Sequence, residues 1–192
     1  MIKHITNADG KGWLIVRWPD GTTVPALPQY LRVEYLKAEA GREHFKVLEG
    51  LRAGSTASVK IKGPGQSYLA NGDPQQPAGT IKFNRTTGQL WYGTSGPIQA
   101  KTLAANPAPL GTHDLEIPDE VHSLGTHYLR DSPFATTWFR VGHSGDRFLH
   151  PGRISAGCVT VTDTKKWTEI YNYLIRCRKG DGKSVGVIII IG

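Results

Sequence analysis

A cysteine and a histidine stand fifteen residues apart in the segment WFRVGHSGDRFLHPGRISAGCVTVTD (138–163). His143 follows an apolar run that predicts a strand, and Cys158 follows Gly157. A free thiol has a pKa of about 8.5, so it needs a base to become a nucleophile at neutral pH. A neighbouring imidazole can take its proton and, as imidazolium, hold the thiolate. The pair predicts acyl transfer with Cys158 as nucleophile and His143 as base. On spacing alone, a buried structural cysteine is the competing interpretation.

The residues around Cys158 fit the same chemistry. Gly157 has no side chain, so a substrate carbonyl could approach the backbone there, and the amides of Gly157 and Cys158 could form an oxyanion hole. Ser155 could donate a hydrogen bond within the site, or it is an ordinary turn serine. Arg140 and Arg153 flank the site and could bind a substrate carboxylate through two parallel hydrogen bonds. As single arginines they are more typical of a solvated surface.

The chain from Ser144 to Arg153 is rich in turn residues and is predicted to be a loop. Within it, His150 is the rival to His143 as base and a further candidate for substrate binding, although a histidine before Pro-Gly is more typical of an exposed loop tip. Asp146 could orient an imidazole or could be a solvated turn residue.

Seven histidines raise the question of a metal site. The histidines and acids with any regular spacing are His122, His127, His143, His150, Asp131 and Asp146. None of these spacings matches HExxH or a Cys/His zinc pattern. The sequence therefore predicts no metal and no cofactor.

Cys177, the second cysteine, is expected on a C-terminal helix as a structural thiol. A Cys158–Cys177 disulfide is an alternative in an oxidising compartment, and it would block the proposed nucleophile. Trp138 and Trp167 are expected in the core rather than as substrate platforms.

Composition indicates an ordinary globular protein, with 192 residues, 39% hydrophobic and 20% charged. The net charge of +7 is scattered along the chain, without a nucleic-acid-binding motif. Such a charge also favours other polyanions, a bacterial cell wall among them. The first residues lack the apolar core of a signal peptide, and no apolar run approaches the ~20 residues of a membrane span. We expect synthesis in the cytoplasm, or an export signal that has been removed, with no membrane span and no nucleic-acid partner.

The elements fall into two parts. In residues 1–78, two short strands flank Pro19-Asp20-Gly21, most of 34–53 is predicted to be helical, and the Gly/Pro-rich stretch 63–79 is predicted to be a linker or long loop. Residues 79–192 begin with a hairpin over 81–92 and short strands after it. Apolar residues at helical spacing predict a helix within 164–180, with Asp163 as N-cap, before a final strand SVGVIIII. We therefore expect two domains, 1–78 and 79–192.

The segment Gly142-His143 … Ser155-Ala156-Gly157-Cys158 resembles the active-site motif of L,D-transpeptidases of the YkuD type. The upstream stretches IKFNRTTGQLWYG and PAPLGTHDLEI resemble the opening hairpin and a following strand of that family. The resemblance covers about 80–163 and none of 1–78. It implies an α+β, β-rich fold class, an L,D-transpeptidase-like β-sandwich or open barrel with a C-terminal helix, to which 1–78 adds a small N-terminal α/β module.

Two positions depart from the family pattern. Ala156 stands where a second histidine is usual, and Thr160 stands where Asn or Arg is usual. These departures and the compact loop make the chain similar to a divergent branch, the DUF2778 group, which includes type VI secretion effectors. That likeness implies an antibacterial toxin that acts in the periplasm of a target cell after secretion, with a cognate immunity protein and the secretion machinery as partners.

The resemblance also implies a reaction. Cys158 would attack the amide after meso-diaminopimelate in a peptidoglycan stem peptide, and His143 would then protonate the leaving D-amino acid. Water would resolve the thioester in an L,D-carboxypeptidase, and an amine would do so in transpeptidation or D-amino-acid exchange. In the family, the carbonyl of the residue after the histidine often orients the imidazole, which implies that role for Ser144. Two alternatives stay open: a non-catalytic wall-binding protein on the same scaffold, and a cysteine amidase with another substrate.

Overall fold

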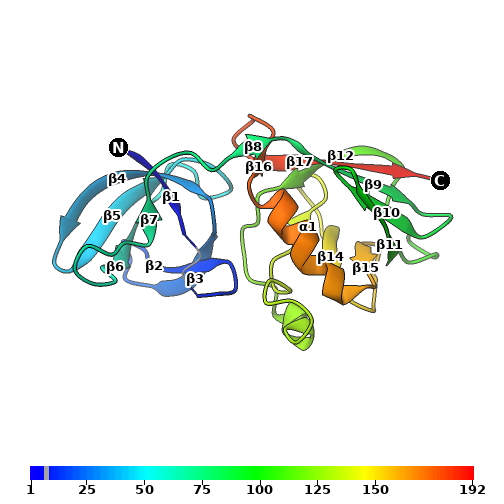
Figure 1. The fold of residues 1–192 in the computed structure, drawn as a ribbon, viewed down its shortest axis with the longest axis horizontal. Helices are drawn as coiled ribbons and strands as arrows, with labels where there is room; N and C mark the ends of the chain where they lie inside the picture. Colours follow the sequence, from blue (N-terminus) through cyan, green and yellow to red (C-terminus); the bar gives the residue numbers. More distant parts are fainter. Residues whose placement is uncertain (7–8) are drawn as a thin grey trace. The chain divides into compact units, whose positions relative to one another are not determined.

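The computed structural model describes residues 1–6 and 9–192, and these form two compact units (Figure 1). The N-terminal unit comprises Met1–Gln75 with Asp119–Val121, and the C-terminal unit comprises Gln76–Pro118 with His122–Gly192. The chain thus passes from the first unit to the second after Gln75, three residues before the boundary expected at 78.

The N-terminal unit is a seven-stranded sheet in the order β3-β2-β6-β5-β4-β1-β7. Its strands are β1 (Ile2–Ile5), β2 (Trp13–Arg17), β3 (Thr23–Pro28), β4 (Arg32–Glu39), β5 (Arg42–Val47), β6 (Thr56–Lys60) and β7 (Leu69–Ala70). The predicted pair of strands around Pro19-Asp20-Gly21 is confirmed as β2 and β3.

The helix predicted over 34–53 is wrong, because this segment is the hairpin of β4 and β5. Glu39 pairs with Arg42, so the turn between the strands has two residues, Ala40 (φ 49°) and Gly41 (φ 72°). Positive φ at both positions is the backbone of the turn that best matches the twist of a hairpin. The unit is therefore built of strands, and the alternation of apolar residues along β4 outweighed its helix-forming composition.

The C-terminal unit contains an eight-stranded sheet in the order β12-β17-β9-β10-β11-β15-β14-β13. Its strands are β9 (Gly79–Asn84), β10 (Gln89–Tyr92), β11 (Ser95–Lys101), β12 (Gly111–Glu116), β13 (Phe139–Arg140), β14 (Phe148–Pro151), β15 (Val159–Val161) and β17 (Ser184–Ile191). A separate small ladder pairs β8 (Gln76–Pro77) with β16 (Cys177–Arg178). A bridge between Leu115 and Val141 links the two ends of the large sheet, so the sheet is nearly closed. The hairpin predicted over 81–92 and the final strand are confirmed.

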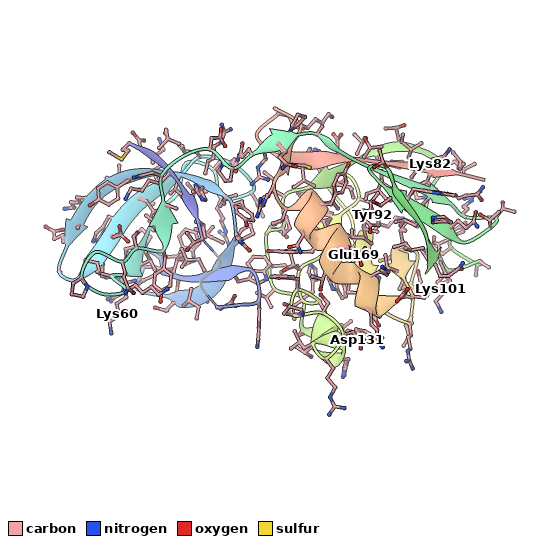
Figure 2. The ribbon with its side chains drawn as sticks, viewed as in Figure 1. Lys60, Lys82, Tyr92, Lys101, Asp131 and Glu169 are labelled. Atoms are coloured by element: carbon pink, nitrogen blue, oxygen red, sulfur yellow. The ribbon has the colours of Figure 1, made fainter. Side chains whose placement is uncertain are left out.

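One α-helix, α1 (Trp167–Leu174), packs on this sheet, and short 3-10 helices cover Ser123–Tyr128 and Thr164–Lys166. The predicted apolar face is confirmed, because Trp167, Ile170, Tyr171 and Leu174 are buried. A methyl group at Gly79 would come within 2.9 Å of Leu174, so the helix lies directly against β9. Figure 2 shows Tyr92 of β10 beside Glu169, to whose carboxylate the phenol donates a hydrogen bond.

The helix is shorter than predicted at both ends. Asp163 precedes the 3-10 turn and makes no capping hydrogen bond with its side chain, and α1 begins after Lys166. Cys177 lies on β16 rather than on the helix. The β-rich class with a nearly closed sheet and a C-terminal helix is nevertheless confirmed. Within the described ranges, no helix has the length and apolarity that crossing a bilayer requires.

Candidate active site

The site is built on two adjacent parallel strands, β14 and β15. The register pairs His150 with Thr160, and Cys158 precedes β15 at the level of Phe148. Side chains alternate between the faces of a strand, so Phe148, His150, Cys158 and Thr160 share one face. Leu149, Val159 and Val161 fill the other face and are fully buried. The strand pair therefore places a thiol and an imidazole on one surface.

That surface borders a cavity of about 400 Å³. The residues that line it are Leu124, His127, Tyr128, Trp138, Asp146, Phe148, His150, Pro151, Gly152, Ile154, Ala156 and Cys158. Apolar and aromatic side chains predominate, and His127, Tyr128, Asp146 and His150 add polar groups to the same lining as the thiol. This composition is typical of a small-molecule or peptide site.

The Cys158 thiol is 8% exposed at this cavity. The Phe148 amide donates to its Sγ at 3.4 Å, and the thiol donates to the Asp146 carbonyl oxygen at 3.6 Å. Burial raises the pKa of Cys158, and the Asp146 carboxylate adds to this, while the Phe148 amide and the Arg147 charge oppose it. The resting group is thus a protonated thiol that needs a base.

His150 is buried and has the tautomer that a base requires. Its Nδ1 lies 3.0 Å from the Pro151 carbonyl oxygen, which can only accept, so Nδ1 carries the proton. Its Nε2 therefore holds the lone pair and accepts from the Thr160 hydroxyl at 3.1 Å. Burial lowers the pKa of His150 below its ordinary value of 6.5, so the imidazole is neutral at pH 7.

Aromatic packing fixes the His150 ring. Trp138 stacks on it with ring centroids 4.3 Å apart, and His122 stacks on the other side of Trp138 at the same distance. Trp138 is half-buried and lines the cavity, so it is not only a core residue, whereas Trp167 is fully buried as predicted.

A tight turn presents Cys158. The Ser155 hydroxyl donates to the Cys158 carbonyl at 2.9 Å, so Ser155 does bond within the site. Gly157 has φ +110°, and a Cβ there would lie 2.9 Å from Arg147 and 3.0 Å from Asn106. In the described parts of the chain, the amides of Gly157 and Cys158 donate to no loop carbonyl and no side chain. Ala156 is exposed at the cavity mouth, where the second histidine of the family pattern would stand.

Arg147 holds this turn, and sequence reasoning missed it. Its Nη1 donates to the Gly157 carbonyl at 2.8 Å and to the Pro107 carbonyl at 2.9 Å, and its Nη2 donates to Asn106 at 2.8 Å. The guanidinium therefore ties the cysteine turn to the loop after β11. Nothing in the sequence distinguishes Arg147 from other basic residues, because its partners are backbone carbonyls and a distant asparagine.

The structure places His143 elsewhere. Its ring nitrogens lie 3.3 Å from Asp114, 3.4 Å from Glu116 and 3.2 Å from the Ser184 hydroxyl. It is not among the residues that line the cavity of Cys158. Ser144 is exposed, and the described contacts of the His143 ring do not include the Ser144 carbonyl. The expected pairing of His143 with Cys158 is thus not what the structure assembles.

The loop predicted over Ser144–Arg153 is wrong for FLHP, and with it the exposed position expected for His150. The structure shows these four residues as strand β14, all of them buried, and His150 is 6% exposed instead of being a surface loop tip. Phe148 and Leu149 directly before the histidine were the available signal, since two large apolar residues are atypical of a solvated loop.

The two candidate arginines differ. Arg140 pairs with Glu116 at 3.0 Å, and its guanidinium lies 4.8 Å from the centre of the Phe148 ring, so it braces the wall of the site. Arg153 is exposed, its amide donates to the Tyr128 hydroxyl, and its side chain has no partner among the described residues. Only Arg153 of these two offers an uncommitted cation beside the cavity.

The surroundings of His143 include donor atoms that could bind a metal. Asp114, His143 and Asp181 each place a ligand atom within 4.8 Å of the others. Lys179 already contacts both carboxylates, at 2.5 Å to Asp114 and 4.0 Å to Asp181, so an internal cation offsets part of their negative charge. Both cysteines are free thiols, and Cys177 is buried and donates to the Tyr173 carbonyl at 3.1 Å.

No protein-family model matches the chain, and no curated protein matches it in sequence. Solved structures of L,D-transpeptidases align with it. One from Mycobacterium tuberculosis H37Rv is 12% identical, with 92% of this chain and 80% of that chain covered and a TM-score of 0.40. L,D-transpeptidase 1 of Mycobacterium tuberculosis is 13% identical, with 93% and 86% covered and a TM-score of 0.39. L,D-transpeptidase 3 of the same organism, in complex with a faropenem-derived adduct, is 13% identical, with 92% of this chain and 81% of that chain covered and a TM-score of 0.39.

Proposed function

We propose that this chain is a cysteine enzyme that transfers the acyl group of peptidoglycan stem peptides, with Cys158 as nucleophile and His150 as base. The observation that carries the proposal is the shared cavity of the Cys158 thiol and a neutral His150 whose Nδ1 proton is held by the Pro151 carbonyl. A thiol that needs a base and a base in the right tautomer lie on one face of one strand pair.

The choice of substrate rests on the sequence resemblance, once the histidine is reassigned. The L,D-transpeptidase pattern implies that the carbonyl after the catalytic histidine orients its ring. Pro151, the residue after His150, does so in this chain. His150-Pro151 followed by Ser155-Ala156-Gly157-Cys158 therefore fits the pattern better than His143-Ser144 does.

The proposed reaction begins with a change in the hydrogen bond of Thr160. The Thr160 hydroxyl has a second acceptor, the Ile154 carbonyl at 3.4 Å, and turning to it frees the lone pair on His150 Nε2. Nε2 then takes the thiol proton as Sγ attacks the carbonyl carbon of meso-diaminopimelate in the amide that joins it to the terminal D-amino acid. The amides of Gly157 and Cys158 stabilise the oxyanion. The C–N bond breaks as the imidazolium gives its proton to the leaving amine, which leaves a thioester on Cys158.

Water or an amine then attacks the thioester, with His150 again as base. Water releases a tripeptide and makes the enzyme an L,D-carboxypeptidase, whereas an amine gives exchange or cross-linking. Arg153 is placed to pair with a carboxylate of the stem peptide. We extend the proposal to a secreted antibacterial effector that acts in the periplasm of a target cell and is opposed by an immunity protein, on the strength of the likeness to the DUF2778 group alone.

The test compares the wild-type chain with Cys158→Ala, using a disaccharide-tetrapeptide and intact sacculi with products read by mass spectrometry. We expect loss of the terminal D-amino acid, or its replacement by an added D-amino acid, with the wild type only. The matched control is Cys177→Ala, which removes the other buried thiol and should keep the activity. Identical products from wild type and Cys158→Ala would refute cysteine catalysis. If the wild type and Cys158→Ala then both sedimented with sacculi, the chain would be a wall-binding protein.

A further inference from the structure

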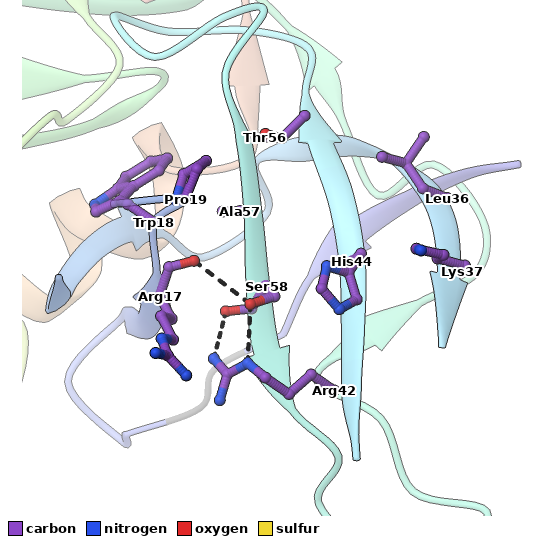
Figure 3. A pocket seen from close by; sticks show the side chains of 10 residues that line it. All are labelled: Arg17, Trp18, Pro19, Leu36, Lys37, Arg42, His44, Thr56, Ala57 and Ser58. Atoms are coloured by element: carbon purple, nitrogen blue, oxygen red, sulfur yellow. Dashed lines mark hydrogen bonds between the residues drawn. The ribbon is translucent and has the colours of Figure 1, made fainter. Parts of the chain in front are cut away.

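The N-terminal unit has a groove, formed by two adjoining cavities, that the proposed reaction does not use. Two cavities, of about 470 and 740 Å³, share Trp18, Pro19 and Thr56 in their walls. The first is also lined by Arg17, Leu36, Lys37, Arg42, His44, Ala57 and Ser58 (Figure 3). The second continues along Asp20, Thr22, Val24, Arg52, Gly54 and Ser55. An elongated hollow of this kind suits a segment of a polymer better than a compact small molecule.

Two arginines line the first cavity, and hydrogen bonds fix the guanidinium of one of them, Arg42. Arg42 donates from Nε to the Ser58 hydroxyl at 2.8 Å and from Nη2 to the Ser58 carbonyl at 2.9 Å. The Ser58 hydroxyl in turn donates to the Arg17 carbonyl at 3.5 Å. Figure 3 shows the guanidinium groups of Arg17 and Arg42 on the same side of Ser58. Arg42 is therefore pre-organised, which reduces the entropy lost when it binds a ligand.

No acid among the described residues lines this first cavity. Lys37 pairs with Glu39 at 2.7 Å, but both side chains are about 60% exposed, and such a surface pair is weak enough for a bound anion to replace it. In the second cavity the Asp20 carboxylate accepts from the Thr22 amide and hydroxyl, at 2.9 and 2.7 Å. The first cavity thus presents like charges that a ligand anion would neutralise.

Trp18 separates the two cavities and adds a flat apolar surface. The Arg52 guanidinium lies 5.4 Å from the centre of the Trp18 ring, and Pro19 stands beside it. A large amphipathic ring in the same wall as Thr56 matches a ligand that has both an apolar face and hydroxyls, as a sugar ring does.

We propose that this groove binds the carboxylate-bearing glycan of the cell wall, with a sugar ring against Trp18 and a stem-peptide carboxylate on Arg17 and Arg42. The choice of wall polymer rests on the proposed function, while the anionic-glycan chemistry rests on the groove itself. Binding there would retain the enzyme on an insoluble substrate independently of Cys158.

The test measures co-sedimentation of the full chain carrying Cys158→Ala with purified sacculi freed of secondary polymers. Arg17→Glu should weaken binding at least tenfold, because an exposed cation in the groove becomes a repelling anion. Lys62→Glu makes the same charge change on an exposed residue of the same unit that lines neither cavity, and it should bind like the parent. Equal losses of binding for Arg17→Glu and Lys62→Glu would contradict the proposal that this groove is the binding site. Trp18→Ala should weaken binding without changing its salt dependence. An unchanged affinity would contradict the proposed contact between Trp18 and a sugar ring.

Two further ligands identify the anion. Isolated teichoic acid presents phosphates and no stem-peptide carboxylates, and double-stranded DNA presents phosphates without a glycan. Tighter binding to the phosphate polymer or to DNA, abolished by Arg17→Glu, would overturn the carboxylate assignment. Arg17→Glu with Cys158 intact should still process the soluble disaccharide-tetrapeptide, so failure of the groove and failure of the catalytic proposal give different results.

Discussion

His143 lies in a loop before β14, and His150 lies within β14, seven residues later. Around His143 the partners are charged or hydroxylic: Asp114, Glu116 and Ser184, with the His143 side chain 36% exposed. Around His150 the ring is stacked on Trp138, buried, and held by a backbone carbonyl and one hydroxyl. The first environment suits a hydrogen-bonding residue that supports the loop, and the second suits a neutral base.

The contrast shows that a triad of residue types does not define a catalytic site. Ser184, His143 and Glu116 are arranged as hydroxyl, imidazole and carboxylate. The Ser184 hydroxyl, however, is 1% exposed and donates to Asp181 at 2.7 Å, so it cannot reach a substrate. The two sites differ in whether a substrate can reach the nucleophile and in which group accepts the proton of that nucleophile. The types of side chain present do not distinguish them.

The most direct way to break the comparison is to remove each imidazole in turn. His150→Gln should lower kcat/KM on the disaccharide-tetrapeptide by about 10²- to 10⁴-fold, the usual contribution of a general base. His143→Gln should change it by less than about threefold, as for a substitution outside the site. Steady-state kinetics with mass-spectrometric detection decide the matter. A larger loss for His143→Gln than for His150→Gln would return the role of base to His143.

The turn that presents the thiol can be tested with a pair of glycines. Gly157→Ala should destabilise the fold by about 1–3 kcal/mol for its positive φ, and the contact with Arg147 should displace the turn and reduce activity further. Gly142→Ala has a comparable φ of +83° with nothing within 4 Å of the new Cβ. It should cost stability but leave the turn in place. Urea denaturation and the rate on the tetrapeptide separate these effects, and equal rate losses would show that the close approach to Arg147 is unimportant.

The smallest expected effect is on pH dependence. Because burial lowers the pKa of His150, the base stays unprotonated below pH 6.5, and the acidic limb of kcat/KM should have its midpoint below that value. Between the folded and unfolded pKa values the unfolded chain binds more protons, so stability should fall as the pH drops through about 6.5. Melting temperatures at pH 7.5 and 5 should show this fall in the wild type and a smaller one in His150→Gln. An acidic limb above pH 6.5 would contradict a buried base.

Much of the fold could be predicted from local patterns. The hairpin over 81–92, the final strand and the buried face of α1 each have the apolar periodicity of the element they form. The helix prediction for 34–53 failed because residues that favour helices, such as Lys37 and Ala38, lie in a hairpin. Its strand pairing and turn determine the secondary structure there. Strand pairing depends on residues distant in sequence, which a local pattern does not contain.

The site was predicted in part for the same reason. Cys158, Ser155 and Gly157 are neighbours in sequence, and the structure keeps them together in one turn. His150 and Thr160 meet only through the parallel register of β14 and β15, and Arg147 acts through carbonyls of 107 and 157. The departure at Thr160 was visible in the sequence, but its role as the partner of His150 required the register.

Strand β17 has a consequence for synthesis of the chain. It lies between β12 and β9 in the large sheet and pairs with both, although it comes last among the strands in sequence. Chains are made from the N-terminus and their domains fold as units. During synthesis, therefore, β9 and β12 cannot pair with β17 until β17 has been made. The sheet that carries β14 and β15 is completed only when Ser184–Ile191 has been released from the exit tunnel.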